Sequence, residues 1–160
     1  MTSKPPFPSQ VDAQFPRDYG KIRGALRKCS IAVVALGQWA AGWPEGAPYG
    51  VSKFRSEMAP VAADLSDLAK TGVVAALRSV NYVPLGYKHL ACPPAEWRTP
   101  FLIDAYNDVL RDLAERTPGV AFVDTSNLTR PLWDLASDWN HPDFAPSDHQ
   151  AAAILARVCR

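Results

Sequence analysis

The chain has 160 residues, enough for one domain with a sizeable hydrophobic core. Its hydrophobic content of 48% and charged content of 21% are typical of globular proteins. A formal net charge of +1 gives no electrostatic reason to expect nucleic acid or an anionic membrane as a partner. No apolar run reaches the roughly 20 residues that a membrane-spanning helix needs.

Residues 1–20 are predicted to form a Pro-rich tail or arm, and residues 21–160 a single α/β domain. The first residues lack the apolar core of a signal peptide, so the sequence indicates no cellular location. A short helix over residues 17–28 is the first regular element, and Gly20 and Gly24 weaken it.

Three continuous apolar runs are predicted to form strands, of which the first, rich in β-branched residues, is expected to be buried on both faces. They cover residues 30–36, 73–80 and 120–124. Such runs are typical of parallel sheets. The first run ends at Gly37, and a loop rich in Gly and Pro follows it.

Helices are predicted between these strands and after them. Residues 54–69 have apolar positions at helical spacing, with Pro60 marking either a kink or the start of the helix. Thr99 is the expected N-cap of the next helix and Pro100 its first residue. Its expected buried face comprises Phe101, Leu102, Ala105, Tyr106, Val109, Leu110 and Leu113. A short helix over 128–136 and a final helix over 150–157 complete the pattern, the last with Ser147 or Asp148 as N-cap.

The alternation of strands and helices predicts an α/β fold. We expect a three-layer, flavodoxin-like parallel sheet with flanking helices and right-handed crossovers. Ligand sites in such sheets form at the carboxyl ends of the strands. Gly37 and Trp39 follow the first strand, Ser79 and Asn81 lie at the end of the second, and the loop before the last helix reaches the same edge.

That last loop carries Asp138 and His141, three residues apart. A carboxylate can accept from one ring nitrogen of histidine and leave the other nitrogen free to take a proton from a hydroxyl nucleophile. The alternative interpretation is a capped turn before a helix. Because the loop falls at the carboxyl edge of the predicted sheet, the catalytic interpretation is favoured.

With these residues in place, the chain resembles the later part of an SGNH (GDSL-type) hydrolase over roughly residues 25–160. The strand ending at Gly37 is similar to the family's strand before a Gly-x-Asn-Asp block, and Asp138 and His141 are similar to its Asp-x-x-His block. Gly37-Gln38-Trp39 resembles the Gly-x-Trp of the PC-esterase branch, which includes the trichome-birefringence-like polysaccharide O-acetyltransferases.

The resemblance implies ester chemistry on acylated carbohydrates or lipids, without metal or cofactor. In that scheme a serine attacks the ester carbonyl, His141 is its general base, Asp138 orients His141, and the Gly37 N–H helps to hold the oxyanion. Trp39 stands where the family has the oxyanion asparagine. Asn81 is a substitute donor or a loop cap.

The family's nucleophile block, Gly-Asp-Ser, is absent from the sequence. Ser79 lacks the sharp turn that presents a nucleophile, and a serine at a strand end is usually structural. We therefore expect the nucleophilic serine to be missing from this chain.

Without the family's first strand, residues 31–36 form an unpaired apolar edge, which is an aggregation hazard. The chain is thus expected to be a fragment, completed by an upstream segment or by another chain. The N-terminal arm is a weaker candidate for covering the edge, because its prolines remove ladder donors.

Several aromatic and reactive residues leave alternatives open. Four tryptophans in loops at the edge either stack on sugars or seal the core, namely Trp39, Trp43, Trp97 and Trp139. The cysteines have no C-x-x-C spacing for zinc. A Cys29–Cys92 disulfide and three free thiols, Cys159 included, both remain open.

Three functions compete. The first is an esterase or acyltransferase domain for O-acyl esters, acetyl esters of carbohydrate above all. The second is a non-catalytic domain of the same fold that binds a glycan or a protein at the same edge. The third, a doubly wound domain for a nucleotide or phosphate, ranks last because no Gly-rich phosphate loop follows any predicted strand.

Overall fold

The computed structural model describes residues 15–42, 48–83, 98–130 and 144–159, and side chains in all of these except 144–147. The chain order is η1 (Pro16–Asp18), α1 (Gly20–Leu26), β1 (Ile31–Val34), α2 (Gln38–Ala41), α3 (Val51–Lys70), β2 (Val74–Arg78), α5 (Pro100–Arg116), β3 (Val120–Val123), α6 (Ser126–Thr129) and α7 (Phe144–Val158).

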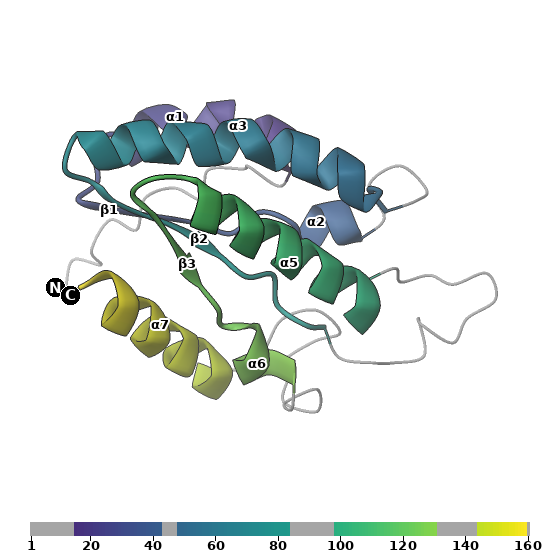
Figure 1. The fold of residues 1–160 in the computed structure, drawn as a ribbon. Helices are drawn as coiled ribbons and strands as arrows, with labels where there is room; N and C mark the ends of the chain where they lie inside the picture. Colours follow the sequence, from purple (N-terminus) through teal and green to yellow (C-terminus); the bar gives the residue numbers. More distant parts are fainter. Residues whose placement is uncertain (1–14, 43–47, 84–97, 131–143, 160) are drawn as a thin grey trace, which may run out of the picture.

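The three strands form one parallel sheet in the order β1-β2-β3. Ile31 pairs with Val74, and Ala76 pairs with Ala121. Figure 1 shows α3 and α5 on one face of this sheet and α7 on the other, with α1 beside α3. The prediction of a three-layer α/β fold with a parallel sheet is confirmed.

A continuous core fills the space between the sheet and helices α3 and α5. The Phe54 and Tyr106 rings stack with their centroids 3.8 Å apart, and both side chains are fully buried. Leu77 of the central strand, Leu65 of α3 and Leu110 of α5 are also fully buried. Each such side chain contributes about 1.5–3 kcal/mol of transfer free energy, so this interface is a main source of stability.

Helix α3 begins three residues before the predicted start and continues through Pro60. Proline removes one main-chain donor, but Pro60 lies on the exposed side, where water can satisfy the freed carbonyl. Helix α5 begins at Pro100 as predicted, and the Thr99 hydroxyl accepts from the Leu102 N–H at 3.4 Å. Phe101, expected on the buried face, is instead 86% exposed, because the buried face follows Ile103, Tyr106, Leu110 and Ala114.

Two helices near the C-terminus differ from the prediction. Helix α6 begins at Ser126, two residues early, and ends at Thr129. Helix α7 begins at Phe144, so the N-cap assigned to Ser147 or Asp148 is wrong. Pro146 falls in the first turn of α7, where the N–H groups lack helical partners and proline costs little.

The face of the sheet that α7 covers is less closed. Val33, Ala121 and Ile154 pack around the buried Ala76, Val123 and Val158. Ile31 and Val74, paired across β1 and β2, are 37% and 39% exposed. Within the described residues no strand pairs with the outer side of β1, so β1 is an edge strand as predicted.

Residues 15–20, assigned to the tail, carry structure in this fold. Tyr19 is buried, and its hydroxyl donates to Asp64 Oδ2 at 2.8 Å. Burial and the Asp64 carboxylate raise the pKa of Tyr19. Arg23 of α1 forms an ion pair with the same carboxylate, which fastens η1 and α1 to α3.

Cys29 and Cys159 carry exposed free thiols, and Cys92 lies outside the described residues. None of the described helices is both long and apolar enough to cross a bilayer.

Candidate active site at the carboxyl edge of the sheet

The chain leaves β1 through Gly37, whose φ of +153° favours glycine. A Cβ here would lie 2.5 Å from Val80 Cγ2, so any side chain would clash. The Gly37 carbonyl accepts from the Ala41 N–H at 2.8 Å and starts α2, a helix that the sequence analysis assigned to loop. Among the described residues the Gly37 N–H has no acceptor.

Trp39 lies on α2 at the same edge and is 51% exposed. The other tryptophans named as edge residues, Trp43, Trp97 and Trp139, lie outside the described residues. An indole so exposed does not seal the core. Its face is accessible to a ligand.

Ser79 follows β2 and is fully buried. Its hydroxyl oxygen accepts from the backbone N–H of Thr125 at 2.8 Å and of Ser126 at 2.9 Å. These bonds satisfy donors at the start of α6, where backbone N–H groups lack helical partners. The geometry favours the structural interpretation of Ser79, since the hydroxyl does not reach solvent.

Asn81 is partly exposed at the end of the central strand's extension. Its Oδ1 accepts from Gln150 Nε2 at 2.7 Å and from Arg78 Nη1 at 3.3 Å. Arg78 Nη1 also lies 3.3 Å from Gln150 Oε1 and 3.5 Å from Thr125 Oγ1. This polar network joins β2, the start of α6 and the second turn of α7. Burial lowers the pKa of the Arg78 guanidinium.

The backbone on both sides of Asn81 is held by side chains that the sequence analysis did not identify. Asn107 of α5 accepts from the Val80 N–H at 2.7 Å and donates to the Val80 carbonyl at 3.1 Å. Thr129 Oγ1 accepts from the Tyr82 N–H at 3.2 Å. A polar residue on the buried face of an amphipathic helix, as Asn107 is, was the available signal.

The Asp124 carboxylate stabilises the turn between β3 and α6. Its Oδ1 accepts from the Ser126 hydroxyl at 2.6 Å and N–H at 3.0 Å, and Oδ2 lies 3.1 Å from Arg111. Burial raises the pKa of this carboxyl, but the Ser126 bonds and Arg111 outweigh it and leave the pKa below its ordinary value. The carboxylate is therefore ionised at neutral pH and stabilises the turn.

The proposed base pair, Asp138 and His141, lies outside the described residues. Helix α7 begins at Phe144, close behind it in sequence. His149 is exposed in the second turn of α7. No three described His, Cys, Asp or Glu side chains group as metal ligands.

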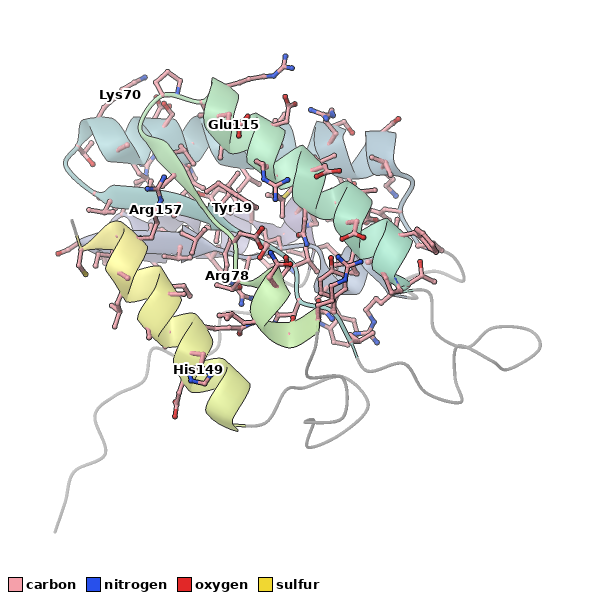
Figure 2. The ribbon with its side chains drawn as sticks, turned by 60° about the horizontal axis from the view of Figure 1, so that its bottom comes forward. Tyr19, Lys70, Arg78, Glu115, His149 and Arg157 are labelled. Atoms are coloured by element: carbon pink, nitrogen blue, oxygen red, sulfur yellow. The ribbon has the colours of Figure 1, made fainter. Side chains whose placement is uncertain are left out.

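A pocket of about 590 Å³ lies away from this edge, between η1, α1 and α3. Tyr19, Arg23, Glu57 and Asp64 contribute to its lining. Figure 2 shows His149 on α7, away from Tyr19. The pocket thus does not include the residues brought together at the carboxyl edge.

No protein-family model matches the chain, and neither does any curated protein sequence. Solved structures do match. Two variants of Axe2, an acetyl-xylooligosaccharide esterase from Geobacillus stearothermophilus, superpose with a TM-score of 0.64.

A catalytic variant of Axe2, described as an acetylxylan esterase, superposes with a TM-score of 0.63. All three structures share 18% sequence identity with this chain, over 91% of its length and 68% of theirs. At this identity the likeness concerns the fold. The chain has an SGNH-hydrolase-like α/β fold, the fold of these esterases.

Proposed function

We propose that the protein is an esterase or acyltransferase domain that acts on O-acyl esters, with acetyl esters of carbohydrate as the favoured substrates. The main support is the convergence of Gly37, Trp39 and Asn81 at the carboxyl edge of a sheet whose structural neighbours are acetyl-xylooligosaccharide esterases. The proposal extends to the PC-esterase branch, and it covers acyl transfer as well as hydrolysis.

In the proposed reaction a serine hydroxyl adds to the ester carbonyl and gives its proton to His141. Asp138 accepts from the other ring nitrogen and fixes the tautomer of His141. His141 then protonates the leaving alcohol, and water or an acceptor alcohol releases the acyl group. The Gly37 N–H, which has no acceptor among the described residues, is the proposed oxyanion donor.

The serine itself is proposed to come from outside these 160 residues, in an upstream segment or another chain. Two observations support this. Ser79 is buried with its oxygen bonded to two backbone N–H groups, so it is a poor nucleophile. The outer side of β1 lacks a partner strand among the described residues, and Ile31 and Val74 are partly exposed beside it. A completing strand would pair with that edge.

The first test measures hydrolysis of p-nitrophenyl acetate by the purified chain, beside His141→Ala and a His149→Ala control. We expect no turnover above that of His141→Ala. Turnover that is lost in His141→Ala but kept in His149→Ala would place a nucleophile within the chain and overturn the proposed external serine, while the esterase proposal would stand.

The base pair is tested without turnover by titrating the three histidines in nitrogen–proton NMR spectra. A carboxylate partner raises the pKa of an imidazole, so Asp138→Asn should lower that of His141 alone. An unchanged His141 titration would remove Asp138 from the proposed role.

A second candidate is a non-catalytic glycan-binding domain, and the exposed Trp39 favours it. Its test is binding of acetylated xylo-oligosaccharide, measured by calorimetry, with Trp39→Ala. Binding that is lost in Trp39→Ala but unchanged in His141→Ala would favour this candidate over the esterase.

A further inference from the structure

The polar network at the end of β2 has a fixed hydrogen-bond direction. Arg78 carries donors only, so the atoms facing it must be the oxygens Asn81 Oδ1 and Gln150 Oε1. With its oxygen directed at Arg78, Gln150 turns its nitrogen toward Asn81 and donates to Oδ1 at 2.7 Å. The orientation of both amide groups therefore follows from the chemistry of Arg78.

This orientation of the Asn81 amide leaves its Nδ2 available to a ligand. Asn81 Oδ1 accepts both bonds, and within the described residues its Nδ2 has no acceptor. The side chain is partly exposed, and it follows the central strand at the carboxyl edge. A ligand oxygen at this edge is the kind of acceptor that Nδ2 lacks.

The network also strengthens that donor. The acceptors described for Arg78 Nη1 are all neutral, so no carboxylate among them cancels its charge. An amide whose oxygen accepts from a cation is polarised, and its N–H groups become better donors. Asn107 and Thr129 fix the backbone of Val80 and Tyr82 on either side, so the donor is held in place before a ligand arrives.

We propose that Arg78 and Gln150 are positioning residues that hold the oxygen of Asn81, so that Asn81 Nδ2 donates to the acyl oxygen of a bound ester and to the carboxylate of the acid product. This inference rests on the proposed esterase function and adds a specific donor to it. Figure 2 shows Arg78 between α6 and α7, consistent with its contacts to Thr125 and Gln150.

The test follows the side-chain amide signals of the 160-residue chain by NMR while sodium acetate, the product of acetyl ester hydrolysis, is added. Sodium chloride at matched ionic strength is the reference, and Asn81→Asp identifies the signal. We expect the Asn81 amide protons to shift downfield and saturate. The Asn107 amide, bonded to Val80 through both of its groups, and the exposed Asn127 should not shift.

Gln150→Glu tests the positioning role. Glutamate at this position has no donor for Asn81 Oδ1, so the Asn81 amide loses the shorter of the two bonds that hold its oxygen. Apparent acetate affinity should fall about tenfold, the loss expected for one hydrogen bond. His149→Glu adds a negative charge on the exposed side of the same helix and should leave the affinity unchanged. Gln150→Met, similar in size and uncharged, replaces Gln150→Glu if that variant does not fold.

The outcomes separate the two proposals. An acetate-dependent shift of the His141 ring signals without any shift of the Asn81 amide would overturn this inference and leave the esterase site standing. Equal affinity in Gln150→Glu and the parent chain would remove the positioning role. If acetate moves neither the His141 nor the Asn81 signals, both the donor and the proposed acyl site at this edge fall.

Discussion

The two faces of the sheet are built differently, although the same three strands supply both. The face under α3 and α5 is closed, with Phe54, Tyr106 and Leu77 fully buried. The face under α7 has a small buried centre around Ala76, and Ile31 and Val74 at its margin are partly exposed. More apolar surface is buried under α3 and α5 than under α7, so the packing of α3 and α5 on the sheet supplies most of the stability. These two exposed side chains lie on β1, the edge strand, and on its neighbour β2.

Replacing Phe54 by alanine should give the largest loss of stability. The ring is fully buried and stacks on Tyr106, so its removal leaves a cavity that the helices cannot close. We expect about 3–5 kcal/mol less free energy of unfolding in urea. Leu155→Ala on α7, where the side chain is 55% exposed, is the matched control and should change it by less than about 0.5 kcal/mol. Similar losses in both variants would contradict the difference between the faces.

Gly37→Ala should be next in size. The added Cβ would lie 2.5 Å from Val80 Cγ2, and φ is positive, so strain and overpacking add. The cost should be about 2–4 kcal/mol in the same assay. Gly20→Ala, where a Cβ meets nothing within 4 Å, should be neutral or slightly stabilising. A neutral Gly37→Ala would mean that the turn after β1 relaxes freely.

Ser79→Ala removes an acceptor from two buried N–H groups, those of Thr125 and Ser126. The Ser126 N–H keeps Asp124 Oδ1 as an acceptor, whereas the Thr125 N–H loses its described acceptor. Leaving this buried donor unpaired costs about 1–3 kcal/mol. Ser56→Ala, an exposed serine bonded to the Lys53 carbonyl, should change stability by less than about 0.5 kcal/mol. Equal values for the two serines would argue against the structural role of Ser79.

Alkaline pH should weaken the attachment of η1 and α1. The pKa of Tyr19 is raised by burial and by Asp64, so the unfolded chain loses this proton first. Tyr82, whose pKa burial and Asp104 raise to about 12, acts in the same direction. The stabilisation is complete below about pH 10 and is lost as pH rises above it. Tyr19→Phe should flatten the fall of the thermal midpoint above about pH 10, and an unchanged slope there would exclude Tyr19 as a source.

The smallest effect is expected for Ile31→Thr combined with Val74→Thr. Both side chains are more than a third exposed, so the change in the free energy of unfolding should stay below about 1 kcal/mol. Binding of a dye for exposed apolar surface should fall. A loss of several kcal/mol would instead mean that Ile31 and Val74 are covered in solution. The surface beside β1 would then not be open to the proposed completing strand.

The strands and the two long helices were predictable because their patterns are strong and local. Apolar runs located the three strands, and Thr99-Pro100 located the start of α5 to the residue. The start of α7 was not predictable in this way, because Pro146 also suits the first turn of a helix that is already under way. Phe101 was assigned to the wrong face, since a helix end can turn an apolar side chain to solvent.

At the carboxyl edge, topology alone indicated where Gly37, Trp39, Ser79 and Asn81 gather. The roles of Ser79 and Asn81 depend on contacts with residues more than 40 positions away, namely Thr125 and Gln150, and no local pattern encodes such pairings. For Asn107 the buried helix face gave a local signal of a buried polar residue, but its partner Val80 lies 27 residues earlier and could not be predicted from it.

The hydrogen bonds of the Asn107 side-chain amide make the undocking of α5 from the sheet measurable by hydrogen exchange. It binds both backbone groups of Val80, as a neighbouring strand would, but it belongs to a helix. The Val80 N–H can therefore exchange with solvent hydrogen only when α5 lifts from the sheet. The exchange rate of this single proton would report the undocking of α5 separately from the fraying of the strands.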